Sequence, residues 1–198
     1  LAYCEAISAS NPCGEQMLPP YGACLLGSIN LAFLVEKPFE ADSTLDEDAL
    51  ADLTATAVRL LDNVIDVSRY PLPEQEAEAK AKRRLGLGIT GLADALLFCG
   101  AAYGSDTGVA MTERWLGVIR KAAYRTSALL AKEKGAFPLY DPAILQQPNL
   151  RALDEETRAL IAAHGLRNGR LTSIAPTRAT SLLAGNVSQG TQPVFAYS

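Results

Sequence analysis

Apolar residues recur at helical spacing in three segments of the chain, each bounded by residues that start or stop helices. Between residues 44 and 69 the apolar positions follow steps of three and four, as on one helix face: Leu50, Leu53, Ala57, Leu60, Leu61, Val64 and Ile65. Thr44 followed by Glu47 predicts a capping box at the start, and Pro71 with Pro73 predicts the end. The first segment is therefore expected to be a long amphipathic helix.

The same signals predict two further helices. One is expected over about residues 107–134, with Asp106 as its N-cap and Gly135 as its C-terminal stop. A shorter helix is expected over about residues 155–163, and it should end at Gly165 because glycine readily adopts the left-handed conformation that terminates helices.

Short apolar segments between these helices predict strands at residues 3–9, 28–35, 171–175 and 194–197. The sequence has no internal repeat, and its one biased segment is the helix-prone polar run EQEAEAKAKRR at residues 74–84. Helices that alternate with short strands are typical of α/β architecture, so we expect an α/β fold.

Gly86, Gly88 and Gly91 stand in the G-x-G-x-x-G order of a dinucleotide-binding turn. Such a turn follows a buried apolar strand. The residues that precede the first glycine include Ala-Lys-Arg-Arg, 81–84. We expect this charged stretch to be unable to form a buried strand. These glycines are therefore interpreted as positions of close backbone packing, not as a nucleotide-cofactor site.

The composition narrows the class of protein. The chain has 198 residues, 48% of them hydrophobic, which is enough for a proper core in one domain or two small ones. No apolar run approaches the ~18 residues of a membrane span. The net charge of −4 argues against a general nucleic-acid or membrane-surface binder. The chain starts at Leu1 without an initiator Met or a leader, so we expect a piece of something longer.

The cysteine pattern indicates a reduced, cytosolic protein without a metal site. The four cysteines are Cys4, Cys13, Cys24 and Cys99, and the one histidine is His164. No C-x-x-C pair is present, so the spacing is wrong for zinc, and an apolar chain of this size needs no disulfide scaffold. Cys4 and Cys99 are interpreted as small buried hydrophobes.

The stretch SNPCGEQMLPPYGAC, residues 10–24, places Cys13 between an amide and a carboxylate. Pro12 favours extended geometry for Asn11. If the segment stays extended, Asn11, Cys13 and Glu15 share one face with neighbours roughly 7 Å apart, around one small polar substrate. Gly14 would leave the opposite face open.

The surroundings of Cys13 indicate which chemistry its thiol suits. Its neighbours in sequence include neither a cation nor a histidine to form a thiolate, so it would be a poor protease-type nucleophile. A neutral thiol is sufficient for hydrogen-atom chemistry. On spacing alone, a turn with an incidental cysteine remains the alternative.

Three segments resemble the ribonucleotide reductase catalytic chain, in the same order along the sequence. NPCGEQMLPPYGACLLGSINL, residues 11–31, resembles its active-site loop and looks most like the adenosylcobalamin-dependent class. LDNVIDVSRYPLP with RRLGLGITGLADAL, residues 61–73 and 83–96, is similar to the middle of that chain. SIAPTRATSLLAGNVSQGTQPVFAYS, residues 173–198, resembles its phosphate-binding region.

The resemblance implies a role for each residue of the active-site loop. Cys13 matches the thiyl-radical cysteine that takes the 3′-hydrogen of the ribose, and Glu15 matches the base that accepts the 3′-hydroxyl proton. Asn11 matches the amide that orients the substrate. Cys24 matches one of two cysteines that supply electrons and end as a disulfide, its partner lying upstream of Leu1. A water-excluding barrel would protect the radical from side reactions.

The third segment also has a physical interpretation of its own. A strand, a tight turn and a helix start direct free backbone N–H groups to one point, where Thr177, Thr180 and Ser181 add hydroxyl donors. The family places the substrate phosphates here, so the expected binding residues are Pro176, Thr177, Arg178, Ala179, Thr180 and Ser181. Arg178 stands where a small residue is usual, and Gln192 where an acidic one is usual.

The resemblance thus implies residues 1–198 as a single, incomplete domain: half of a ten-stranded α/β barrel, with Cys13 on a finger loop at its centre. It implies reduction of ribonucleoside diphosphates with adenosylcobalamin, a thioredoxin-type reductant, and the rest of the reductase chain or a complementary subunit. No activity is expected of the piece alone. The alternatives are a metal-radical reductase of the same fold and a non-catalytic phosphate-binding or assembly module.

Overall fold

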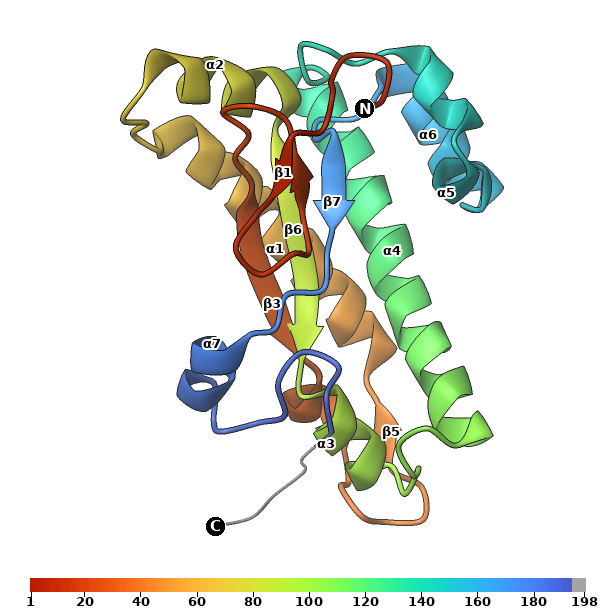
Figure 1. Ribbon diagram of the computed structural model, residues 1–198. Helices are drawn as coiled ribbons and strands as arrows, with labels where there is room; N and C mark the ends of the chain where they lie inside the picture. Colours follow the sequence, from red (N-terminus) through yellow and green to blue (C-terminus); the bar gives the residue numbers. More distant parts are fainter. Residues whose placement is uncertain (194–198) are drawn as a thin grey trace.

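The computed structural model describes residues 1–193, which form an α/β fold built on a three-stranded parallel sheet (Figure 1). The strands are β3 (Leu25–Asn30), β6 (Arg84–Thr90) and β7 (Arg170–Thr172), in the order β3-β6-β7. Leu25 pairs with Leu85 and Arg84 with Arg170. Within residues 1–193, both outer strands have an open edge and the sheet does not close into a barrel.

Two long helices cover one face of the sheet and pack on each other: α1 (Glu47–Val67) and α4 (Asp106–Lys134). Every residue of β6 is buried, and Leu85, Leu87 and Ile89 belong to the core between the sheet and these helices. The opposite, inner face of β6 carries Gly86 and Gly88, and a short hairpin crosses in front of it (Figure 1).

The remaining elements frame this layer. The hairpin consists of β1 (Ala9–Ser10) and β2 (Met17–Leu18), and β4 (Val35–Glu36) pairs with β5 (Thr44–Leu45). The short 3₁₀ helices are η1 (Leu31–Leu34) and η2 (Pro142–Gln146). The other α-helices are α2 (Pro73–Lys82), α3 (Leu92–Phe98), α5 (Pro148–Arg151), α6 (Glu155–His164) and α7 (Arg178–Leu183).

The three expected helices are present, but both expected N-caps are wrong. The N-cap of α1 is Asp46, whose carboxylate accepts a 2.9 Å hydrogen bond from the Ala49 N–H. Thr44 lies in β5 instead, so it forms no capping box. Ser105 caps α4 by accepting from the Gly108 N–H, and Asp106 is the first helical residue. The expected ends of α4 and α6 at Gly135 and Gly165 are confirmed.

The expected strands are confirmed only in part. Residues 3–8 contain turns and irregular chain, and the strand expected at 28–35 begins three residues earlier and gives way to η1. The strand expected at 171–175 is β7, which ends at Thr172. The strand expected at 194–197 lies outside the described residues.

The expectation that residues 81–84 could not lead into a buried strand is wrong. Arg84 opens β6 and is 2% exposed. Burial is possible because its guanidinium pairs with the carboxylates of Glu5 and Glu78, and Glu78 also pairs with Lys82. Buried cations are tolerated when they are paired in this way.

No helix of residues 1–193 is long and apolar enough to cross a membrane.

Candidate active site

Residues 11–16 form a tight loop at the tip of the β1–β2 hairpin. The Asn11 N–H donates to the Gln16 carbonyl at 2.9 Å, and the Asn11 side-chain oxygen accepts from the Gln16 N–H at 3.0 Å. The Gly14 N–H donates to the Asn11 carbonyl at 3.0 Å, and Gly14 has a φ of +82°, which favours glycine. The expected extended geometry is therefore wrong, because the loop's own hydrogen bonds bend the chain here.

The hairpin tip packs closely on the inner face of the sheet. A Cβ at Gly86 would lie 2.9 Å from Gln16 Nε2 and 2.4 Å from Leu26 Cδ2. A Cβ at Gly88 would lie 2.3 Å from the Ser173 carbonyl oxygen. The two glycines thus make room for the hairpin and for the chain after β7, which confirms the interpretation of close backbone packing.

The hairpin tip, strand β3, the chain before α7 and the start of α7 line an open cavity of about 570 Å³. It is lined by Cys13, Glu15, Leu26, Gly27, Ser28, Ala175, Pro176, Thr177, Arg178, Thr180 and Gln192. The structure therefore brings the cysteine and the carboxylate of the loop together with the turn at 175–180, although the two segments are about 160 residues apart in sequence.

Glu15 and Gln16 present buried polar atoms that have no partner within the described residues. Both carboxylate oxygens of Glu15 and both amide atoms of the fully buried Gln16 lack a hydrogen bond. Buried polar atoms are nearly always paired in folded proteins, so such a group indicates a site for a ligand or for another part of the protein. Cys13, by contrast, lies exposed at the tip.

Cys24 lies just before β3 and is half-buried. Burial raises the pKa of its thiol, the negative charge of Glu15 raises it further, and the positive charge of Arg170 opposes both. A small cavity of about 30 Å³ next to the thiol is also lined by Tyr70 and Arg84. Cys24 is therefore within electrostatic range of Glu15, although it does not line the larger cavity.

Thr177 at the N-cap of α7 and Thr180 and Ser181 within the helix carry three hydroxyl groups, of which two are used internally. Thr177 has a φ of +53°, and its hydroxyl accepts from the Gly190 N–H at 2.8 Å and donates to the Thr90 hydroxyl. The Ser181 hydroxyl donates to the Arg178 carbonyl. Thr180 keeps an exposed hydroxyl on the cavity wall.

Four of the six expected binding residues line the cavity: Pro176, Thr177, Arg178 and Thr180. Ala179 and Ser181 do not. Gly27 and Ser28 also line the cavity, although no sequence motif marked them as site residues. The available signal was the alternation along β3, which places Ser28 on the same face as Leu26.

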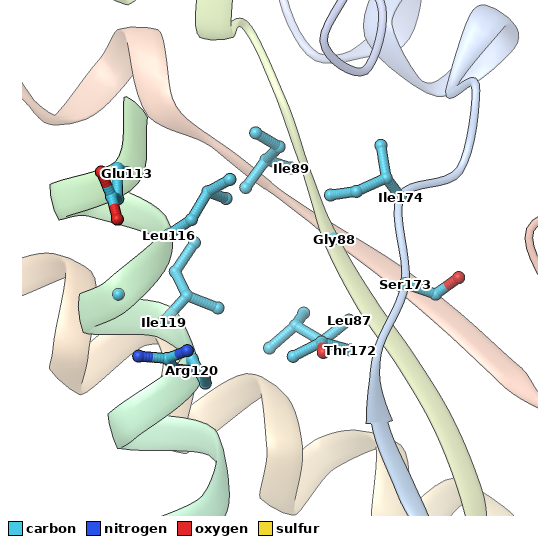
Figure 2. Close-up of a pocket in the computed structure, with 11 residues that line it drawn as sticks. Leu87, Gly88, Ile89, Glu113, Leu116, Ile119, Arg120, Thr172, Ser173 and Ile174 are labelled. Atoms are coloured by element: carbon cyan, nitrogen blue, oxygen red, sulfur yellow. The ribbon is translucent and has the colours of Figure 1, made fainter. Parts of the chain in front are cut away.

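A second cavity of about 470 Å³ lies on the other side of the sheet, between α4 and strands β6 and β7 (Figure 2). It is largely apolar, with Glu113 and Arg120 on the helix side (Figure 2). In this view the Ser173 hydroxyl points away from α4, towards the inner face of the sheet. None of the cysteines lines this second cavity, so the chemistry-bearing residues gather at the first one.

Within residues 1–193, no group of three or more His, Cys, Asp or Glu residues is arranged to hold a metal ion. His164 ends α6 and is not among the residues that line the cavity at Cys13.

Comparison with known proteins identifies the family. The whole chain, residues 1–198, matches the family described as ribonucleotide reductase, barrel domain. It is 42% identical over 190 residues to a vitamin B12-dependent ribonucleoside-diphosphate reductase of Mycobacterium tuberculosis, covering 96% of this chain and 24% of that protein. A protein of the same name from Thermoplasma acidophilum is 33% identical, with 96% of this chain and 22% of the relative covered.

A ribonucleoside-diphosphate reductase subunit alpha of Chlamydia muridarum is 34% identical over 218 residues, with 96% of this chain and 20% of the relative covered. The chain thus spans about a quarter to a fifth of the length of these relatives. The chain belongs to the ribonucleotide reductase barrel-domain family.

Proposed function

We propose that this chain is part of a ribonucleotide reductase barrel that reduces ribonucleoside diphosphates to 2′-deoxyribonucleotides. The observation that carries the proposal is the shared cavity, where Cys13 and Glu15 meet the turn at residues 175–180. The relatives are named for this reaction. The chain would be a single, incomplete domain, and the open edges of β3 and β7 would pair with strands of the remaining protein to complete the ten-stranded barrel.

Cys13 would act as a thiyl radical that takes the hydrogen atom from C3′ of the ribose. Glu15 would accept the proton of the 3′-hydroxyl, which eases loss of the 2′-hydroxyl as water. The two buried, unpartnered oxygens of Glu15 support this role, because a substrate hydroxyl would supply the missing donor. Asn11 does not line the cavity, and its side-chain oxygen holds the loop. Its amide nitrogen would orient the substrate from the edge of the site.

The substrate diphosphate would lie at the other end of the cavity. The backbone N–H groups at the start of α7 have no partner within that helix, and Thr180 adds a hydroxyl donor on the cavity wall. Arg178 is exposed and lines the same wall, so its guanidinium would contact the phosphates directly.

Cys24 and a cysteine outside this chain would supply two electrons and end as a disulfide, which a thioredoxin-type dithiol would reduce again. The electrostatic reach between Cys24 and Glu15 supports a position next to the substrate. Without the second cysteine and the rest of the barrel, the 198-residue chain would have no activity of its own.

Adenosylcobalamin enters the proposal because two of the relatives are named as vitamin B12-dependent. When bound, it would supply the radical that is passed to the protein. To receive this radical, the chain would need an accessible thiol. Cys13, which is exposed at the hairpin tip, would provide it.

Activity of variants of the full-length protein would test the proposal. Cys13→Ala should abolish deoxynucleotide formation with ribonucleoside diphosphate, cofactor and dithiol, because no other group at the tip can take the hydrogen atom. Cys99→Ala, which removes a thiol at the end of α3, should keep the wild-type rate. A wild-type rate for Cys13→Ala would refute the catalytic role and favour the non-catalytic phosphate-binding or assembly module.

A metal-radical reductase is the second candidate function, favoured by the similarity to the subunit alpha of Chlamydia muridarum. The two candidates differ in the source of the radical. Turnover that requires adenosylcobalamin supports the first, and turnover that requires a separate radical-generating subunit supports the second.

A further inference from the structure

Cys24, Arg84 and Arg170 lie in one row across the sheet, near the ends where its strands begin. The register pairs Leu25 with Leu85, which places Cys24, one residue earlier, level with Arg84. Arg170 pairs with Arg84 on its other side. Neighbouring strands lie about 4.8 Å apart, so the backbone at Cys24 is roughly 10 Å from that at Arg170, within reach of an arginine side chain.

The two arginines of this row differ in their partners. Arg84 is almost fully buried and pairs with Glu5 and, at 2.8 Å, with Glu78. Arg170 is half-buried, and no carboxylate among residues 1–193 forms an ion pair with it. The charge of Arg84 is therefore already compensated by carboxylates, whereas the charge of Arg170 is available to a thiolate at Cys24.

A negative charge on Cys24 would need such a cation. The groups that surround the thiol are Glu15 of the hairpin, Tyr70 and Arg84 at the small cavity, and Arg170 of β7. Burial raises the pKa of Cys24 most, and Glu15 raises it further. Arg170 is the group whose charge lowers this pKa.

We propose that Arg170 is a positioning residue that stabilises the Cys24 thiolate when a disulfide at Cys24 is reduced. The inference rests on the proposed function, in which Cys24 and a cysteine outside this chain are oxidised as the substrate is reduced. It adds to that function a residue that governs the recovery of the reduced enzyme.

The step balances with a dithiol as the reductant. A thiolate of the dithiol attacks the sulfur of the partner cysteine, the S–S bond breaks, and Cys24 leaves with the electron pair as a thiolate beside Arg170. The Cys24 thiolate then takes a proton. The second thiolate of the dithiol attacks the mixed disulfide, which releases the partner cysteine and leaves the reductant as a disulfide.

The full-length protein with Arg170→Gln, Arg170→Lys or Arg120→Gln would test this role. Arg120 is a matched control because it is an exposed arginine of α4 without an ion pair among the described residues. The pre-reduced proteins are alkylated with iodoacetamide from neutral to alkaline pH, and the Cys24 peptide is quantified by mass spectrometry. Single-turnover yield and steady-state turnover with a dithiol are measured on the same samples.

Arg170→Gln should move the alkylation midpoint of Cys24 to higher pH, with roughly three- to tenfold lower reactivity at neutral pH. It should also slow steady-state turnover with the dithiol more than it slows the single turnover. Arg170→Lys should keep the midpoint near that of the wild type, because the charge is retained, and Arg120→Gln should leave it unchanged.

An Arg170→Gln midpoint equal to that of the wild type would overturn the proposal, as would a shift of the same size in Arg120→Gln. A loss of single-turnover yield as large as the loss of steady-state rate would also overturn it, because the effect would then lie in substrate reduction. Failure of the wild-type protein to form deoxynucleotide would refute the proposed function, whereas the alkylation midpoints would still decide the role of Arg170.

Discussion

The Ser173 hydroxyl donates a 2.9 Å hydrogen bond to the carbonyl oxygen of Glu15. This bond joins the chain that leaves β7 to the tip of the β1–β2 hairpin, 158 residues away in sequence. Ser173 also continues the sheet, since its N–H donates to the Leu87 carbonyl at 3.0 Å. The position of the Glu15 carboxylate in the cavity is therefore tied to the sheet itself.

Ser173→Ala should loosen this attachment. The loss of one hydrogen bond should lower the free energy of unfolding by about 1 kcal/mol, and a misplaced Glu15 should slow turnover. Ser43→Ala is a matched control, because the Ser43 hydroxyl donates a 2.9 Å bond to the Phe98 carbonyl, away from the cavity. Denaturant unfolding and turnover of the full-length protein should show similar stability losses but an activity loss for Ser173→Ala alone. Equal activity in both variants would contradict the positional role of Ser173.

The two inner-face glycines of β6 should respond differently to alanine. At Gly88 the new Cβ meets backbone, 2.3 Å from the Ser173 carbonyl oxygen, so Gly88→Ala should lower the free energy of unfolding by about 1–3 kcal/mol. At Gly86 it meets the side-chain ends of Leu26 and Gln16, which can shift. Gly86→Ala should therefore cost less stability but slow turnover by displacing the hairpin.

Gly117→Ala provides the control for both glycine variants. A Cβ there meets nothing within 4 Å, and Gly117 lies inside α4. Alanine in a helix is favoured by roughly 1 kcal/mol over glycine, so thermal unfolding should show unchanged or raised stability. A Gly88→Ala protein as stable as Gly117→Ala would show that β6 and the chain after β7 do not approach as closely as the structure shows.

The α/β class, the three main helices and the close packing of the glycines could be predicted from the sequence, because apolar periodicity and glycine placement are local signals. The burial of Arg84 could not, since Glu5, one of its two carboxylate partners, is 79 residues away. The loop geometry of residues 11–16 was also not predictable from alternation, because the Asn11 side chain and backbone close the turn. The grouping of Cys13 with residues 175–180 depends on tertiary structure and was expected only through the family resemblance.

The ion pair between Asp66 and Arg83 should make stability depend on pH in the acidic range. A 2.7 Å hydrogen bond from Arg83 lowers the pKa of Asp66 below its value of 3.8 in a free chain. A lowered folded pKa means that the contribution is present above the unfolded value and is lost as the pH falls through the folded value. Because Asp66 is 43% exposed, the effect is small.

Asp66→Asn should therefore be less stable than the wild type near neutral pH, and the difference should shrink as the pH falls below about 4. Asp48→Asn in the exposed first turn of α1 tests whether any lost carboxylate has this effect. Urea unfolding across acidic to neutral pH would measure both. A stability difference for Asp66→Asn that stays constant over this range would contradict the assignment.

Glu15→Gln should slow deoxynucleotide formation by roughly 10²- to 10⁴-fold, the effect typical of a general acid–base group. The amide keeps the size of the side chain but cannot accept the 3′-hydroxyl proton. Glu36→Gln, at an exposed position of β4, should keep the wild-type rate. Both variants are compared with the wild type by the steady-state rate of the full-length protein. A Glu15→Gln rate within about twofold of the wild type would exclude Glu15 as the base.

The most direct test of the central claim is an experimental structure of the full-length protein with a bound ribonucleoside diphosphate. We expect the ribose C3′ to face the Cys13 sulfur, the 3′-hydroxyl to lie at the Glu15 carboxylate, and the diphosphate to lie at residues 176–180, where α7 begins. A ribonucleotide bound elsewhere, with the cavity between the hairpin tip and that turn filled by another part of the protein, would contradict it.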